Sequence, residues 1–135
     1  MKSIGSLRVM MSVCLLAVAA PGLAQTPSYS TQTDAATLEA ASAGGSGTAS
    51  FYLGYKLANG VGVAKDPARA AALYKLAGER GVREGWFNYG IMVENGVGIA
   101  KNLGAATQAF KKSADAGYAK GMAFYADMLR DGLGV

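Results

Sequence analysis

Apolar residues along the chain recur with the spacing of helices. Ala70, Leu73, Tyr74 and Ala77 stand at positions i, i+3, i+4 and i+7, which places them on one face of a helix. No stretch shows the alternation with a period of two that would indicate a β-strand. The hydrophobic pattern therefore predicts an all-α protein.

The same pattern returns every 36 residues. The sequence NGVGVAKD at 59–66 recurs as NGVGIAKN at 95–102, and its beginning recurs as DGLGV at 131–135. Self-similarity at a fixed period of this length is the signature of a protein built from stacked supersecondary units. Each period holds two helical patterns, so we expect a series of helix pairs.

Local signals mark the ends and the inner face of these helices. Asp66 can cap the free N–H groups of the second helix of the repeat, Pro67 suits its first turn, and Gly81 can end it in a left-handed conformation. Gly54 and Gly90 stand on the inner face of the first helix, where glycine costs up to about 1 kcal/mol in helix propensity. We expect the close approach of a neighbouring helix to offset this cost.

The first 24 residues have the order of a secretory signal. Lys2 and Arg8 precede the apolar stretch 9–20, and Pro21 follows it. This stretch is shorter than the roughly 20 residues that span a bilayer. We expect removal of residues 1–24, no membrane span afterwards, and export to the periplasm or the medium, with an uncleaved membrane anchor as the alternative.

The phase of the repeat divides the rest of the chain. Residues 25–33 are rich in Ser, Thr and Gln and are expected to form a flexible leader. Residues 34–46 align with the second half of a repeat and predict a degenerate half-repeat with a helix at 34–43, the alternative being a disordered linker. The remaining segments are repeat one at 47–81, repeat two at 82–117 and a truncated repeat three at 118–135.

Composition excludes several kinds of chemistry. The chain has no His, and its one Cys, Cys14, lies in the expected signal. The chain therefore lacks the residues for Ser-His or Cys-His catalysis and for the usual zinc sites. We expect no enzyme activity, no metal and no cofactor. Without the signal, 11 Lys and Arg stand against 9 Asp and Glu. A net charge of +2 does not provide the basic field that nucleic-acid binding needs.

These residues resemble the Sel1-like repeat family, a relative of the tetratricopeptide repeats. The resemblance rests on the pairs Leu53-Gly54 and Tyr89-Gly90, the Gly-x-Gly-Val turn, the Lys-Asp or Lys-Asn before the second helix, and the closing Gly. It covers residues 47–135, with a weaker echo at 34–46. It implies an α/α superhelical solenoid of stacked helix hairpins.

The resemblance also carries expectations about function. Members of the family usually serve as adaptors that hold protein partners on a concave face, and many bacterial members are exported and act in the cell envelope. A cysteine-rich branch has been linked to penicillin binding and β-lactam hydrolysis, but the repeats here contain no Cys. We therefore expect an exported adaptor that binds a protein or peptide. The alternatives are a β-lactamase-like envelope enzyme and a truncated, non-functional fragment of a longer repeat protein.

By analogy with tetratricopeptide repeats, the partner-binding residues lie on the first helix of each repeat, off its inner stripe. Aromatic side chains flanked by charge suit a peptide-binding groove. For the phenylalanines among them, a place in the core is an equal alternative. The candidates are Phe51, Tyr55, Phe87, Ile91, Glu94, Asp127 and Arg130.

The third repeat stops at Val135, where its second helix should begin. Stacked repeats normally finish with a polar capping element, yet the segment 119–130 presents Met122, Tyr125 and Leu129. Either the chain is truncated relative to longer relatives, or this face packs on another copy or on a partner. We expect marginal monomer stability or self-association through residues 119–130.

Overall fold

The computed structural model describes residues 27–135, which form six α-helices and no strand. The predicted all-α class is confirmed. The expected signal at 1–24 and the first two residues of the leader lie outside the described residues. The helices are α1 (Ala35–Ala43), α2 (Gly47–Asn59), α3 (Pro67–Glu79), α4 (Arg83–Asn95), α5 (Leu103–Asp115) and α6 (Ala119–Arg130).

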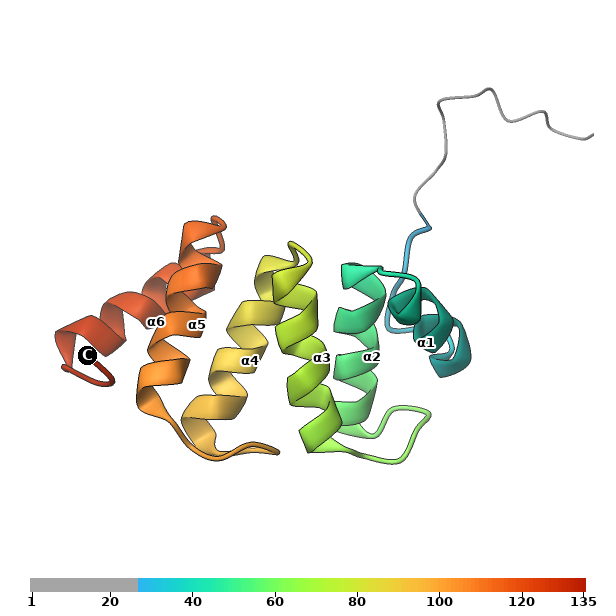
Figure 1. Cartoon of the computed structure of the whole chain (residues 1–135), viewed down its shortest axis with the longest axis horizontal. Coiled ribbons are helices and arrows are strands. Elements are labelled where there is room, and N and C mark those ends of the chain that lie inside the picture. The colour runs from blue at the N-terminus through green and yellow to red at the C-terminus, as the bar shows by residue number, and fades with distance from the viewer. Residues whose placement is uncertain (1–26) are drawn as a thin grey trace, which may run out of the picture.

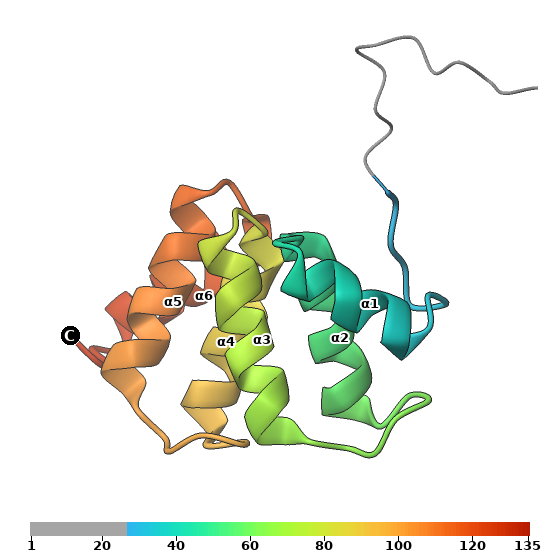
Figure 2. The same ribbon diagram turned by 45° about the vertical axis from the view of Figure 1, so that its right-hand side comes forward.

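The six helices follow one another along a curved row (Figure 1), each packed against the next in the chain. Figure 2 shows the row as two layers, with α1, α3 and α5 in front of α2, α4 and α6. The front layer holds the second helix of each repeat, and the rear layer holds the first. This is the solenoid of stacked helix hairpins that the period predicts.

The recurring turn has the same structure in both complete repeats. α2 and α4 each end at a left-handed glycine, Gly60 with φ 68° and Gly96 with φ 66°. α3 begins with the side chain of Asp66 accepting a hydrogen bond from a backbone N–H, and Asn102 does the same for α5. The expected Asp66 cap is confirmed, and Gly81 after α3 has the expected positive φ, 92°.

Two glycines allow an aromatic ring to lie directly on a helix backbone. A Cβ atom added to Gly90 would lie 2.7 Å from Cε1 of Phe110, and one added to Gly54 would lie 3.1 Å from Cδ1 of Tyr74. Both rings are buried and both come from the helix that follows. The expected close approach is confirmed, and it is made by a ring of the second helix of the same repeat.

The buried apolar side chains form two clusters along the row. The first cluster surrounds Leu53 and Tyr74 and joins α1, α2 and α3. The second surrounds Val93 and Phe110 and extends to α6. Because each repeat contacts only its neighbours, stability is spread along the row.

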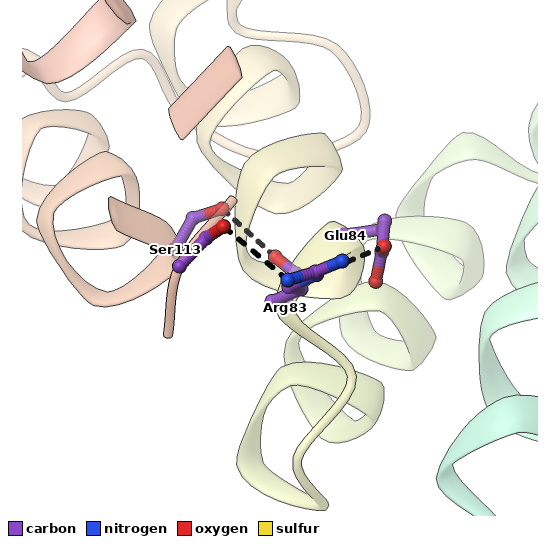
Figure 3. A network of polar contacts seen from close by, with 4 residues as sticks. Arg83, Glu84 and Ser113 are labelled. Carbon is purple, nitrogen blue, oxygen red and sulfur yellow. Dashed lines mark hydrogen bonds and ion pairs between the residues drawn. The ribbon is translucent and has the colours of Figure 1, made fainter. Parts of the chain in front are cut away.

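Polar contacts fasten the end of α5 to the start of α4. The fully buried Ser113 donates a hydrogen bond through Oγ to the carbonyl oxygen of Arg83, at 2.9 Å. The Arg83 guanidinium donates to the carbonyl oxygen of Gly117 at 3.2 Å and to Glu84 at 3.3 Å, and Figure 3 shows these side chains at the junction. The hydroxyl of Ser113 is thereby satisfied, whereas a buried hydroxyl without a partner would cost about 1–3 kcal/mol.

We expect Gly90→Ala to lower the free energy of unfolding by about 1–3 kcal/mol, because the new methyl group overlaps the Phe110 ring. Gly104→Ala in α5 is the matched control. Its Cβ would meet other atoms only at 3.4 Å or more, and its φ is not in the left-handed region. It should be neutral or stabilise the protein by up to about 1 kcal/mol. Urea unfolding of the two variants checks this, and equal stability would contradict the role given to Gly90.

Candidate functional site

A groove with a volume of about 370 Å³ lies between α2 and α4, with Tyr74 of α3 at its base. It is the larger of the two hollows described in this part of the chain. Its lining combines apolar side chains, tyrosine rings and amides. The lining residues are Tyr55, Ala58 and Asn59 of α2, Tyr74 of α3, Asn88, Ile91, Met92 and Asn95 of α4, and Lys65 and Val97 of the turns.

The repeat places equivalent side chains on both walls of the groove. Tyr55 and Ile91 stand one repeat apart, and so do Asn59 and Asn95. Nδ2 of Asn59 donates to the carbonyl oxygen of Tyr55 at 2.9 Å, and Nδ2 of Asn95 donates to that of Ile91 at 2.8 Å. These bonds fix the orientation of each amide. They leave each side-chain oxygen as an acceptor, so the groove presents the same acceptor on both walls.

The groove carries one full charge, the ammonium of Lys65, and no carboxylate lines it. Burial raises the pKa of Tyr74 to about 12, against the opposing effect of its hydrogen bond with Asn88. Tyr74 is therefore a neutral hydroxyl at physiological pH. The arrangement suits an apolar ligand with an acidic group, because a low-polarity wall strengthens the attraction of a single ammonium.

Two of the residues predicted to bind a partner meet in this groove. Tyr55 on α2 is exposed, Ile91 on α4 is half-buried, and both line it. Their equivalent on α6 is Asp127, one repeat farther along the row. The shared phase of these positions therefore places them on one side of the rear layer.

The structure packs the two predicted phenylalanines among other aromatic rings. The ring centroid of Phe51 lies 5.6 Å from that of Tyr74. The centroid of Phe87 lies 5.8 Å from that of Phe110 and 5.1 Å from that of Phe124. Both phenylalanines are half-buried, and neither lines the groove. Their contacts are those expected of the alternative in which they belong to the core.

The three charged candidates lie outside the groove. Arg130 and Asp127 form an exposed ion pair within α6, at 2.8 Å. Glu94 is half-buried on α4 and does not line the groove. As partner-binding residues these three remain predictions.

Other lining residues have a role that sequence reasoning does not assign. Asn59 and Asn95 end α2 and α4, and Tyr74 lies on the apolar helix face found in the sequence; all three also line the groove. Lys65 belongs to the recurring turn. The recurrence of Asn59 as Asn95 marks these two amides in the sequence. It does not distinguish a residue that ends a helix from one that binds a ligand.

Within residues 27–135, no three His, Cys, Asp or Glu side chains lie close enough together to hold a metal ion. None of the helices α1 to α6 is long and apolar enough to cross a bilayer.

The buried tyrosine predicts a dependence of stability on pH. The pKa of Tyr74 is about 12 in the folded chain, against about 10 for an unfolded tyrosine. The unfolded chain therefore loses this proton first as the pH rises. The free energy of unfolding should fall between about pH 10 and pH 12, by on the order of 2–3 kcal/mol, and this group should have no effect below about pH 10.

Tyr74→Phe isolates this contribution, because Phe110 already fills the equivalent position of the next repeat. Urea unfolding of both proteins across this pH range should show a shallower decline for the variant. Identical slopes would exclude a raised pKa at Tyr74.

Comparison of the sequence with protein-family models gives no match, and comparison with curated proteins gives none. Solved structures do match. A Sel1 repeat protein from Oxalobacter formigenes has 30% sequence identity and a TM-score of 0.70, over 74% of this chain and 41% of that one. Helicobacter pylori cysteine rich protein B has 27% identity and a TM-score of 0.66, over 71% of this chain and 72% of that one.

A protective antigen of uropathogenic Escherichia coli strains, described as displaying an SLR fold, has 25% identity and a TM-score of 0.72. The match covers 76% of this chain but 22% of the antigen. The chain thus spans less than half the length of the first and third of these structures. The repeat period, the glycine contacts and these likenesses together show that the chain belongs to the Sel1-like repeat family.

Proposed function

We propose that the chain is an exported adaptor that binds an extended segment of a partner protein in the groove between α2 and α4. The observation that carries this proposal is the lining of the groove, which is largely apolar and contains no Asp or Glu. It presents one ammonium and, on each wall, the side-chain oxygen of an asparagine as an acceptor. Stacked helix hairpins offer such surfaces because each repeat adds equivalent side chains along the row.

The chemistry of the groove defines its occupant. Ile91, Met92 and Val97 provide an apolar wall for one or two apolar side chains of the partner. No carboxylate lines the groove beside Lys65, so its ammonium can pair with an acidic residue of the partner. The oxygens of Asn59 and Asn95 can accept backbone N–H groups, which an extended peptide leaves unpaired. The expected partner segment is therefore extended, apolar and acidic.

Export is supported by the N-terminal sequence and by one relative. Residues 1–24 combine a basic start, an apolar stretch and a small-residue end. The Escherichia coli neighbour is described as a protective antigen, which fits a protein encountered outside the cytoplasm. We infer that this chain acts in the cell envelope after removal of residues 1–24.

A display library of random peptides tests the groove. The full-length chain is expressed in a bacterium, and the exported product serves as bait; its intact mass should show a start at Gln25. Selected peptides should combine apolar side chains with Asp or Glu. In fluorescence polarisation, Tyr55→Ala and Lys65→Glu should each weaken binding at least about tenfold, or about 1.4 kcal/mol.

Lys101→Glu is the matched control for charge, since Lys101 stands one repeat after Lys65 and does not line the groove. It should leave the affinity unchanged. Selection of peptides without acidic residues, or equal losses for Lys65→Glu and Lys101→Glu, would refute the groove as the binding site.

A second proposal concerns the face of α6. Three equivalent residues, one repeat apart, differ in exposure: Leu57 is 5% exposed and Val93 1%, but Leu129 is 46% exposed. Leu57 packs with residues of α3 and Val93 with residues of α5. Met122, seven residues before Leu129 and on the same face of α6, is also exposed. This face is thus of the kind that a second helix of a repeat covers elsewhere in the same structure.

We propose that α1 of a second copy covers this face of α6. α1 aligns with α3 and α5 in the repeat, but no first helix precedes it among the described residues. Its exposed residues Ala36, Ala40 and Ala43 are small, so large side chains of α6 can pack on it.

Sedimentation velocity from about 1 to about 500 μM checks this arrangement, because mass action makes association depend on concentration. The mean mass of the wild-type chain should rise with concentration. Leu129→Glu and Ala40→Glu should both keep it monomeric, whereas Val61→Glu, at an exposed site in the turn after α2, should not. A monomer at every concentration, or association that survives Ala40→Glu, would overturn the proposal.

A further inference from the structure

A second cavity of about 210 Å³ lies in the layer of α3 and α5, apart from the groove. It shares no lining residue with the groove. α4 forms its floor, and α3 and α5 form its sides. The lining residues are Lys75 of α3, Trp86 and Tyr89 of α4, and Ala105, Gln108, Ala109 and Lys112 of α5.

The floor of this cavity is a pair of aromatic rings held against α3. The centroids of Trp86 and Tyr89 lie 6.3 Å apart, with an angle of 70° between the ring planes. A Cβ atom added to Gly78 would lie 2.6 Å from the Trp86 ring. The absence of a side chain at Gly78 therefore makes room for Trp86 against the backbone of α3, where packing restricts its movement.

Two ammonium groups lie above these rings. Nζ of Lys112 is 4.2 Å from the centroid of Trp86, and Nζ of Lys75 is 6.0 Å from that of Tyr89. A ring face attracts a cation, but such a contact leaves the full charge of the cation in place. The rings position the ammonium groups without neutralising them.

Neither ammonium has a carboxylate partner within residues 27–135. The neighbouring Lys111, by contrast, pairs with Asp115 at 2.8 Å. No Asp or Glu lines the cavity, while Gln108 supplies an amide and Tyr89 a hydroxyl. Two like charges thus share one small cavity with hydrogen-bond donors and no counter-charge, an arrangement that an anion would stabilise.

We propose that this cavity binds a small oxyanion with two or more acidic groups. Lys75 and Lys112 would each pair with one acidic group, and the Gln108 amide would donate a further hydrogen bond. The cavity is smaller than the roughly 300–1,000 Å³ of pockets for drug-sized ligands, so the ligand is a compact polycarboxylate or phosphate. Polycarboxylates and phosphates both present a cluster of negatively charged oxygen atoms, and titration with one anion of each class distinguishes them.

The chain contains a single Trp, Trp86, so its fluorescence reports on this cavity. The full-length chain is titrated with sodium citrate and, separately, with sodium pyrophosphate, at an ionic strength held constant with sodium chloride. We expect a saturable change in emission, because the anion draws the Lys112 ammonium away from the indole. Saturation by both anions shows recognition of charge, and saturation by citrate alone or pyrophosphate alone assigns the site to carboxylates or phosphates.

Three single substitutions decide whether the cavity is responsible. Lys75→Ala should weaken binding at least tenfold while leaving the contact between Lys112 and Trp86 intact, so its starting spectrum should match the wild type. Lys112→Ala should weaken binding to a similar extent. Lys111→Ala removes the same charge one residue away, at a side chain outside the cavity, and should bind as the wild type does.

The proposal fails if neither anion gives a saturable change, or if sodium chloride alone reproduces it. It also fails if Lys75→Ala binds with wild-type affinity, or if Lys111→Ala loses as much affinity as Lys112→Ala. Thermal unfolding followed by circular dichroism accompanies each variant, so that a lost response in a folded protein is attributed to the cavity. Isothermal titration calorimetry of Lys112→Ala gives a second readout that does not depend on the indole.

Discussion

The contact of an aromatic ring with a glycine on the neighbouring helix is the constraint on which the rest of this structure depends. Tyr74 lies on Gly54, and one repeat later Phe110 lies on Gly90. Each contact brings the second helix of a repeat close to the first, and the buried clusters form around the same rings. The position of Tyr74 at the base of the groove follows from this contact. A bulkier residue at either glycine would therefore alter the packing, and one at Gly54 would also alter the groove.

The two layers of the solenoid present different surfaces. The groove between α2 and α4 is largely apolar with one ammonium, whereas the cavity between α3 and α5 has two ammonium groups above aromatic rings. Neither is lined by a carboxylate. Several acidic side chains are instead held in exposed ion pairs, such as Glu39 with Arg69 and Asp115 with Lys111, which contribute little to stability because water screens them. This distribution favours recognition of acidic ligands by both surfaces.

The candidate site could be predicted only in part. Tyr55 and Ile91 follow from the repeat phase, because equivalent positions of stacked helices lie on the same side of the row. Phe51 shares the same helix as Tyr55 but packs against Tyr74, because a first helix contacts neighbours over much of its circumference. Lys65 was missed because a charged residue in a turn resembles any solvated lysine until the walls around it are known.

The sequence by itself determined the helices, their ends and their order. Caps, left-handed glycines and apolar stripes act within a few residues, and the period repeats them, so a linear pattern is sufficient to find them. Only the tertiary structure decided which of several equivalent positions are covered. Val93 is buried and Leu129 is exposed, although both occupy the same place in the repeat. Likewise Lys112 reaches Trp86 of another helix while the adjacent Lys111 pairs within its own helix. The reason is that burial and charge pairing depend on which neighbouring helix is present, and a one-dimensional period does not contain that information.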